Sequence, residues 1–283
     1  MNKILFHSPN ALLLDLKTLI REFLLFIGIE KKYSTQPFSM SDRKKLESAP
    51  RYTEIMINFF GKPFYVPDAT TFLSGFKEIY KKQPYRFLFK KEFPCIIDCG
   101  ANIGLSIIYY KQMYPDADVI AIEPDPRLFN ILKKNMDSFG YTDVKLFQNA
   151  VWYRNEKLKF KQEGGFSGQV YNGAEFTNVI DVEAITLDKF LEKGNIGFLK
   201  LDIEGAENDI FTLNPPDLSN VSNVFIEYHS RKHESQSLHK ILEILSEYGF
   251  RYHIHHEFIT PSPLINRSDL VGMDLQLSVF AHK

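Results

Sequence analysis

The stretch IIDCGANIGLS, residues 96–106, places an acid and small residues directly after two β-branched residues. Gly100 permits a tight turn, and Gly104 lets a helix begin close to a ligand. The spacing G-x-x-x-G differs from the G-x-G-x-x-G of dinucleotide-binding loops, which hold a pyrophosphate at a helix N-terminus. The carboxylate of Asp98 beside this loop would repel phosphate and attract a cation. The loop therefore favours a ligand that has an ammonium group and a ribose but no phosphate.

Polar side chains also follow the next two expected strands. Glu123 ends the second strand, where a carboxylate can accept hydrogen bonds from both hydroxyls of a ribose. Asn149 follows the third strand and could read an adenine edge. This series fits an adenosine with a positively charged amino-acid tail, which describes S-adenosylmethionine. The residues expected to contact this cofactor are Asp98, Gly100, Ala101, Asn102, Gly104, Glu123, Pro124, Asn149, Ala150 and Asp202.

Acids and a histidine at two later strand ends could move a proton. Asp202 and Glu204 occupy alternate positions of one strand end, and Glu227 and His229 repeat this spacing on the next strand. One acid could contact the cofactor or substrate while the other orients it or acts as a base. His229 is the first choice for a general base, because the reference pKa of histidine, ~6.5, suits proton transfer near neutrality. A hydrogen-bonded structural histidine is the alternative.

Two groups of residues raise the question of a metal. Asp202, Glu204, Glu227 and His229 include oxygen and nitrogen donors suited to Mg²⁺ or Mn²⁺, but nothing in their spacing requires an ion. A divalent metal is therefore considered but not favoured. The trio His253, His255 and His256 is better explained as part of a solvated edge strand.

From Cys95 onward, expected strands alternate with expected helices. This rhythm predicts an α/β fold with a mostly parallel sheet and helices on both faces. The last two strands have no helix between them, so we expect one antiparallel strand at the C-terminal end. A Gly-containing stretch over 154–177 is expected to form hairpins. The strands are expected at 95–98, 118–123, 144–147, 179–185, 197–204, 223–229, 251–259 and 274–282, and the main helices at 105–113, 126–139 and 237–248.

Residues 1–90 are expected to form an extension before this domain at 91–283. An apolar stripe over 9–29 predicts an amphipathic helix, whose four internal charges argue against a transmembrane span. We expect this helix to pack on its own domain or on a second subunit of a homodimer, with peripheral membrane contact as the alternative. A polar linker at 31–51, a hairpin around Gly61 and a helix over 70–82 complete the extension.

The chain of 283 residues is 44% hydrophobic and 24% charged, which excludes disordered and low-complexity classes. Residues 1–90 carry 15 basic and 8 acidic residues, whereas residues 91–283 carry 19 and 27. The acidic strand ends would repel phosphates, so nucleic acid is not expected as a partner. Cys95 and Cys99 would lie ~13 Å apart on a strand, too far for a disulfide, so reduced thiols and a cytoplasmic location are expected.

Five blocks of the sequence together resemble the FkbM family of S-adenosylmethionine-dependent methyltransferases. They are DCGANIG, IEPDP, NAVW, TLDKF and LKLDIEGAE, and the match covers roughly residues 94–229. The resemblance implies a Rossmann-like class I methyltransferase fold and methyl transfer, commonly to a hydroxyl of a sugar, glycan or natural product. By position, it gives the loop role to Asp98, Gly100, Asn102 and Gly104, and the ribose role to Glu123.

Other function classes remain as alternatives. A nicotinamide-dependent oxidoreductase, or another nucleotide-binding α/β protein, would share the fold, but the missing G-x-G-x-x-G argues against it. The sequence therefore predicts an O-methyltransferase acting on a small-molecule or glycan acceptor.

Overall fold

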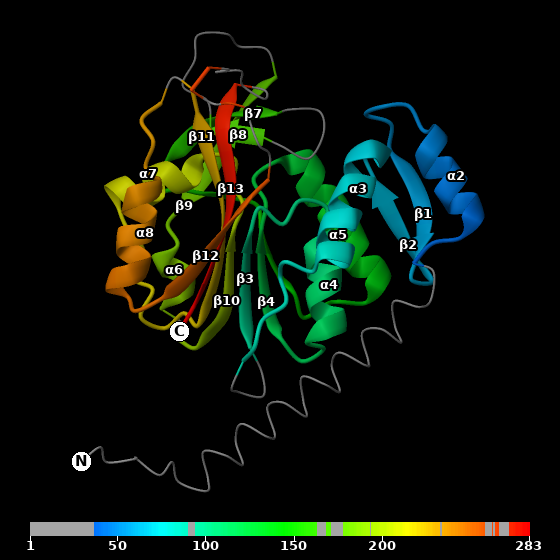
Figure 1. Ribbon diagram of the computed structural model, residues 1–283. Helices are drawn as coiled ribbons and strands as arrows, with labels where there is room; N and C mark the ends of the chain where they lie inside the picture. The colour runs from blue at the N-terminus through cyan, green and yellow to red at the C-terminus, as the bar shows by residue number, and fades with distance from the viewer. Residues whose placement is uncertain are drawn as a thin grey trace, which may run out of the picture.

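A seven-stranded sheet forms the centre of the protein in the computed structural model (Figure 1). The structure describes residues 37–89, 94–162, 168–170, 178–192, 194–232, 234–257, 262, 264–265 and 272–283. The strand order is β12-β13-β11-β10-β3-β4-β5. The strands are β3 (Cys95–Cys99), β4 (Asp118–Ile122), β5 (Lys145–Phe147), β10 (Ile196–Leu201), β11 (Asn223–Arg231), β12 (Arg251–His256) and β13 (Met273–His282).

The direction of the strands confirms the predicted mixed sheet. Strands β11, β10, β3, β4 and β5 pair in parallel, whereas β13 runs antiparallel to both β11 and β12. The carboxyl ends of the parallel strands meet at one edge of the sheet, where ligands of such folds bind. All six residues of β10 are buried, as expected for a strand that is covered on both faces.

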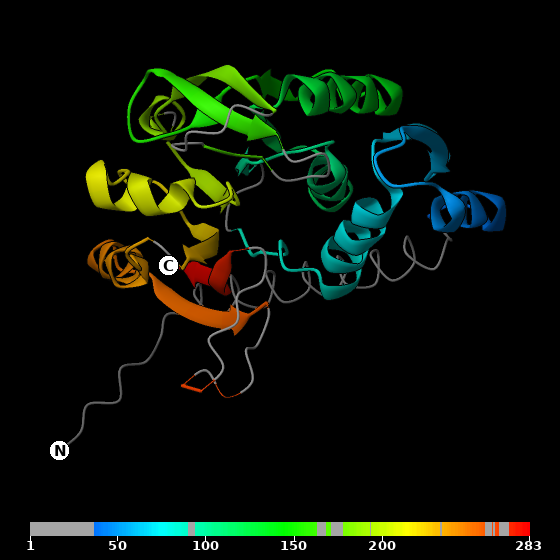
Figure 2. The same cartoon turned by 90° about the horizontal axis from the view of Figure 1, so that it is seen from above.

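Helices cover both faces of this sheet, as Figures 1 and 2 show. Ile96 packs into the hydrophobic cluster on one face and Ile97 into the cluster on the other, because successive side chains of a strand point to opposite sides. Helices α4 (Leu105–Met113) and α5 (Pro126–Phe139) belong to the first face. Helices α6 (Asp188–Leu191), α7 (Ala206–Leu213) and α8 (Leu238–Glu247) belong to the second.

A smaller four-stranded sheet has the order β6-β9-β7-β8. Its strands are β6 (Ala150–Val151), β7 (Lys157–Gln162), β8 (Gly168–Val170) and β9 (Val179–Ile185). The antiparallel pairing of β7 with β8 confirms that the stretch over 154–177 contains a hairpin.

The extension packs onto the main domain through aromatic side chains. It contains α2 (Met40–Ser48), β1 (Ile55–Phe59), β2 (Lys62–Val66), α3 (Ala69–Phe76) and the π-helix η1 (Lys77–Lys82). The ring of Phe59 lies 5.7 Å from that of Phe72 and 6.4 Å from that of Phe139 in α5. Tyr80 meets Tyr109 of α4 edge to face at 5.4 Å. The helix expected over 70–82 is thus an α-helix followed by a wider π-turn.

Several expectations about the ends and edges can be compared with the structure. The short helix α2 lies within the expected linker at 31–51, and the hairpin β1–β2 turns at Gly61. All of β12 is exposed at the edge of the sheet, which confirms a solvated edge strand for the three histidines. The amphipathic helix expected over 9–29 lies outside the described residues. Among the described helices, none has both the length and the apolar character needed to cross a bilayer.

Candidate functional site

A cavity of about 250 Å³ opens at the carboxyl ends of β3, β4 and β10. The strand ends and the loops after them form one side of its lining, and α3 and η1 of the extension form another. Ten of the residues expected at the site line this cavity: Gly100, Ala101, Asn102, Glu123, Pro124, Asn149, Ala150, Asp202, Glu204 and Glu227. Asp98, Gly104 and His229 are buried behind this lining.

The loop between β3 and α4 has a backbone that requires glycine. Gly100 has a φ of +86°, and a Cβ built there would lie 1.9 Å from the carbonyl oxygen of Asp202. Gly104 has a φ of +87°, and its Cβ would meet Leu132 and Met136 of α5 at 2.7 and 2.6 Å. The first glycine therefore lets β3 and β10 approach each other at the cavity, and the second lets α5 pack against the start of α4.

Glu123 connects the two loops that follow β3 and β4 at the cavity. Its carboxylate accepts hydrogen bonds from the backbone N–H groups of Asn102 and Asp125, both at 2.9 Å. Burial raises the pKa of Glu123 to about 8, although these two hydrogen bonds act in the opposite direction. The carboxyl group is thus held in place at the cavity wall before any ligand arrives.

Asp98 lies behind the residues that line the cavity and does not line it itself. Its carboxylate accepts a hydrogen bond from Ser106 Oγ at 2.6 Å and lies 3.2 Å from Nζ of Lys200. Burial raises the pKa of Asp98, and Lys200 opposes this rise. The same ammonium group lies 3.1 Å from Asp202 and donates to the carbonyl oxygen of Gly100 at 3.0 Å.

Sequence reasoning missed Lys200, and a signal for it was present. A lysine in the middle of the apolar strand GFLKLDIE must find buried anions, since an unpaired ammonium would be costly to bury. Asp98 of the neighbouring strand pairs with Lys200 in the β3–β10 register and supplies one of them.

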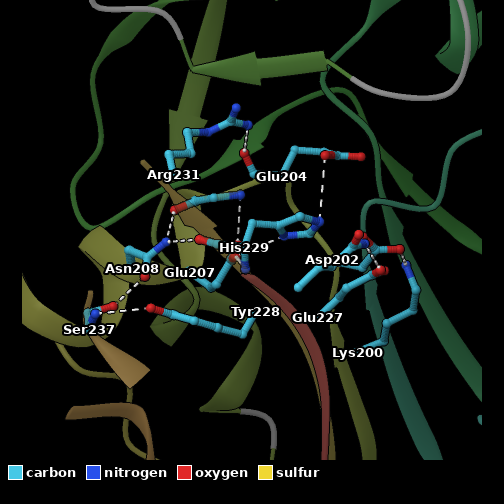
Figure 3. Close-up of polar contacts among 12 residues, drawn as sticks. Lys200, Asp202, Glu204, Glu207, Asn208, Glu227, Tyr228, His229, Arg231 and Ser237 are labelled. Atoms are coloured by element: carbon cyan, nitrogen blue, oxygen red, sulfur yellow. Dashed lines mark hydrogen bonds and ion pairs between the residues drawn. The ribbon is translucent and has the colours of Figure 1, made fainter. Parts of the chain in front are cut away.

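Asp202 and Glu227 form a pair of acids on neighbouring strands at the cavity (Figure 3). Burial and the negative charge of Asp202 raise the pKa of Glu227, whereas Lys200 and His229 help to keep the pKa of Asp202 low. We infer that Glu227 carries the proton and Asp202 the charge. Gln276 of β13 donates a further hydrogen bond to Glu227.

His229 is held between two glutamates, as Figure 3 shows. Its Nδ1 lies 3.0 Å from Glu207, and its Nε2 lies 3.6 Å from Glu204. Burial alone would lower the pKa of His229, but Glu207 and Glu204 overcome this effect and raise it to about 10. The ring is therefore a cation near neutrality. This differs from the expected general base, because an imidazolium has no free lone pair to accept a proton.

Glu204 has the properties that were expected of His229. Its side chain is 29% exposed and lines the cavity, and burial raises its pKa to about 7 while His229 opposes the rise. Glu204 has a φ of +57°, and its carbonyl oxygen accepts a hydrogen bond from Arg231 at 3.1 Å. A carboxyl group that titrates near neutrality and reaches the cavity can accept a proton there.

Donor atoms of Asp202, Glu227 and His229 lie within 4.8 Å of one another, a spacing that a metal ion could bridge. These donors are already engaged. Lys200 lies beside Asp202, and the two ring nitrogens of His229 face Glu207 and Glu204. The donor set therefore does not call for a metal, and we assign no role to one.

The extension contributes cavity residues that sequence reasoning missed. Thr71, Ser74, Glu78 and Ile79 from α3 and η1 line the cavity, together with Tyr85. Their spacing of three and four residues marks one face of a helix, opposite to the aromatic stripe that anchors it. That regular spacing was the available signal.

Asn149 lines the cavity, next to Ala150. Its amide group donates to the carbonyl oxygen of Glu183 at 3.2 Å, which holds the side chain against β9.

Known methyltransferases are similar to this chain. The family model described as the methyltransferase FkbM domain matches residues 98–252. The 2-O-methyltransferase NoeI of Sinorhizobium fredii is 27% identical over 183 residues, which cover 57% of this chain and 74% of that protein. Methyltransferase 1 of Beauveria bassiana is 24% identical over 192 residues, covering 59% of this chain and 77% of that protein.

Two solved structures are also similar. The methyltransferase FkbM of Methylobacillus flagellatus KT is 17% identical with a TM-score of 0.44, and the match covers 71% of this chain and 46% of that one. M. jannaschii TYW2 in complex with AdoMet is 13% identical with a TM-score of 0.45, covering 82% of this chain and 87% of that one.

Proposed function

The chain belongs to the FkbM family of methyltransferases, and on that premise we propose that it transfers the methyl group of S-adenosylmethionine to a hydroxyl oxygen. The acceptor is a small molecule or glycan of the sugar or natural-product type. The observation that carries the proposal is the cavity itself, which brings the glycine loop, Glu123 and the acid Glu204 to one place.

The cofactor is proposed to occupy the side of the cavity formed by the loops after β3 and β4. Glu123 would accept hydrogen bonds from the ribose hydroxyls, and Asn149, which also lines the cavity, would contact an adenine edge. Asp202 carries a negative charge that suits the ammonium group of the methionine tail. Asp98 acts through Lys200 and the loop, because its carboxylate is fully buried.

The cofactor supplies an electrophilic methyl carbon on a sulfonium. The acceptor oxygen forms a bond to this carbon while the carbon–sulfur bond breaks, and S-adenosylhomocysteine leaves with the electron pair on sulfur. The protein must hold the oxygen in line with that bond and exclude water. The hydroxyl proton passes to the carboxylate of Glu204, so charge is balanced.

His229 is proposed as a positioning residue for this base. Its imidazolium lies beside the Glu204 carboxylate and stabilises the ionised form that can accept a proton. Glu207 keeps the ring charged and oriented through Nδ1.

The choice of an oxygen acceptor is supported by the similarity to NoeI, whose name describes a 2-O-methyltransferase. The ionised carboxylates at the cavity, Asp202 among them, disfavour a nucleic-acid acceptor, since its phosphates would be repelled. No finding supports the nicotinamide-dependent oxidoreductase. Cys95 and Cys99 form no disulfide, which fits the cytoplasmic location that we propose.

The test is transfer of labelled methyl from S-adenosylmethionine to a pool of hydroxylated acceptors, followed by mass spectrometry of the product. We expect one methyl group on oxygen and an equal amount of S-adenosylhomocysteine. Methylation on nitrogen or carbon, or no turnover despite cofactor binding, would overturn the proposed acceptor chemistry.

A further inference from the structure

The wall of the cavity that faces the catalytic acids comes from the extension. Thr71, Ser74 and Glu78 present polar side chains from one face of α3 and η1. The family model begins at residue 98, so this wall lies outside the region that defines the family. A part of the chain that is not shared by the family motif is a natural place to choose the acceptor.

Glu78 is the charged residue of this wall. Its carboxylate makes no hydrogen bond or ion pair with any residue that the structure describes. Burial raises the pKa of Glu78, and the negative charges of Glu257 and Asp202 add to the rise. A half-buried carboxyl group that lines a cavity in this way can accept hydrogen bonds from the hydroxyl groups of a ligand.

The nearby cations are already engaged. Nζ of Lys82 lies 3.3 Å from Glu257, and Nζ of Lys200 lies between Asp98 and Asp202 at 3.2 and 3.1 Å. A phosphate or carboxylate on the acceptor would therefore meet the carboxyl groups of Glu78 and Glu204 without a spare cation among the described lining residues. Such an acceptor would be disfavoured, because like charges repel strongly in a partly buried site.

Three contacts hold the helical segment that carries Glu78 in place. The Lys82–Glu257 ion pair ties the end of η1 to the end of β12 across the sheet edge. At the other end, Asp68 caps α3 by accepting from the N–H of Thr71 at 2.9 Å. Between them, Tyr80 packs edge to face on Tyr109. Glu78 thus projects from a helix fixed at both ends and in the middle.

We propose that Glu78 binds the acceptor by accepting hydrogen bonds from its hydroxyl groups, and that this wall selects non-anionic polyhydroxylated acceptors over phosphorylated or carboxylated ones. This inference rests on the proposed function, since it names the substrate class for the same cavity. It assigns to the extension a role in acceptor choice, separate from the cofactor site.

The experiment compares the wild type with Glu78→Gln, which keeps the shape of the side chain and removes its charge. Glu47→Gln is the matched control, because Glu47 lies on the surface of α2 in the same extension. An extract of oligosaccharides and small glycosides is separated by anion exchange into unretained and retained fractions. Each fraction is incubated with saturating methyl-labelled S-adenosylmethionine, and cofactor affinity is measured separately by calorimetry.

We expect labelling of the unretained fraction by the wild type and by Glu47→Gln. For Glu78→Gln we expect an initial rate lower by about tenfold or more at equal cofactor affinity, the effect of losing a hydrogen bond to a charged group. The inference would be overturned if the wild type labelled the retained fraction faster than the unretained one. It would also be overturned if Glu78→Gln labelled the unretained fraction at the rate of the wild type. Label in neither fraction, with the cofactor bound, would refute the acceptor class as well. Failure of the wild type to bind the cofactor would instead refute the proposed function.

Discussion

The carboxylate of Glu204 lies 3.6 Å from Nε2 of His229, a ring that Glu207 keeps in its charged form. The acid reaches the cavity, whereas the histidine is 1% exposed. The carboxylate of Glu204 is therefore the group that can accept a proton, and the imidazolium of His229 sets the pKa of that carboxylate.

Replacement of Glu204 by glutamine should remove the base and leave the shape of the cavity unchanged. We expect kcat to fall by about 10²–10⁴, the usual contribution of general base catalysis. The affinity for S-adenosylmethionine should change little, as calorimetry would show. Glu243→Gln is the control, since Glu243 is an exposed residue of α8 that pairs with Lys240. A Glu204→Gln enzyme with near wild-type kcat would exclude this base.

The pH profile should report the interaction between His229 and Glu204. The pKa of Glu204 is about 7, so kcat of the wild type should rise with pH through that value as the carboxylate ionises. His229→Asn removes the positive charge that lowers the pKa of Glu204. The rise should therefore move to higher pH.

Glu207→Gln gives a second test of the same relationship. It removes the anion that raises the pKa of His229, but it also removes a negative charge that raises the pKa of Glu204. These two effects on Glu204 oppose each other, so the profile of Glu207→Gln should move less than that of His229→Asn. Melting temperatures would show that both variants fold. An unmoved profile in folded His229→Asn would mean that His229 has only a structural role.

Binding of the cofactor should release a proton from Glu123. Because the pKa of Glu123 is about 8, the group is mostly protonated near pH 7. Ribose hydroxyls donate best to the ionised form, so binding should lower this pKa and tighten as pH rises. Calorimetry in buffers of different ionisation enthalpy measures the released proton. Glu123→Gln should abolish the Glu123 part of this release, and an unchanged proton count would contradict the ribose role.

Asp68 should stabilise the extension against acid. Burial alone would raise the pKa of Asp68, but hydrogen bonds from Tyr52, Arg51 and Thr71 hold it well below the usual range of an aspartate. Because the folded pKa lies below the unfolded one, the stability from Asp68 is complete above about pH 4 and is lost as pH falls further. Asp68→Ala should lower the free energy of unfolding by about 1–3 kcal/mol near pH 7.

Urea denaturation at several pH values measures this effect. Asp116→Ala is the control, because Asp116 is exposed. The gap between wild type and Asp68→Ala should narrow below about pH 4. A gap of equal size at pH ~2 would show that the charge of Asp68 contributes nothing.

The sequence predicted the sheet and the glycine loop after β3 because their signals are local. Asp98, Gly100 and Gly104 lie within seven residues of chain, and the alternation of strands and helices is regular. The role of Asp98 was harder to predict, since Lys200 reaches it only when β3 and β10 pair in register.

The charge of His229 could not be read from its neighbours in the sequence. Glu207 comes from α7 and Glu204 from the turn before it, and folding brings both to a ring on β11. Glu78 was missed for a similar reason, because its place at the cavity depends on how the extension packs against α4 and α5.

Titration of the wild type with S-adenosylmethionine by calorimetry, with NADH alongside and Glu123→Gln as the variant, tests the central claim most directly. We predict one site for S-adenosylmethionine of micromolar affinity, a loss of about tenfold or more in Glu123→Gln, and no binding of NADH. Binding of NADH without binding of S-adenosylmethionine, or equal affinity in the variant, would contradict the proposed cofactor site.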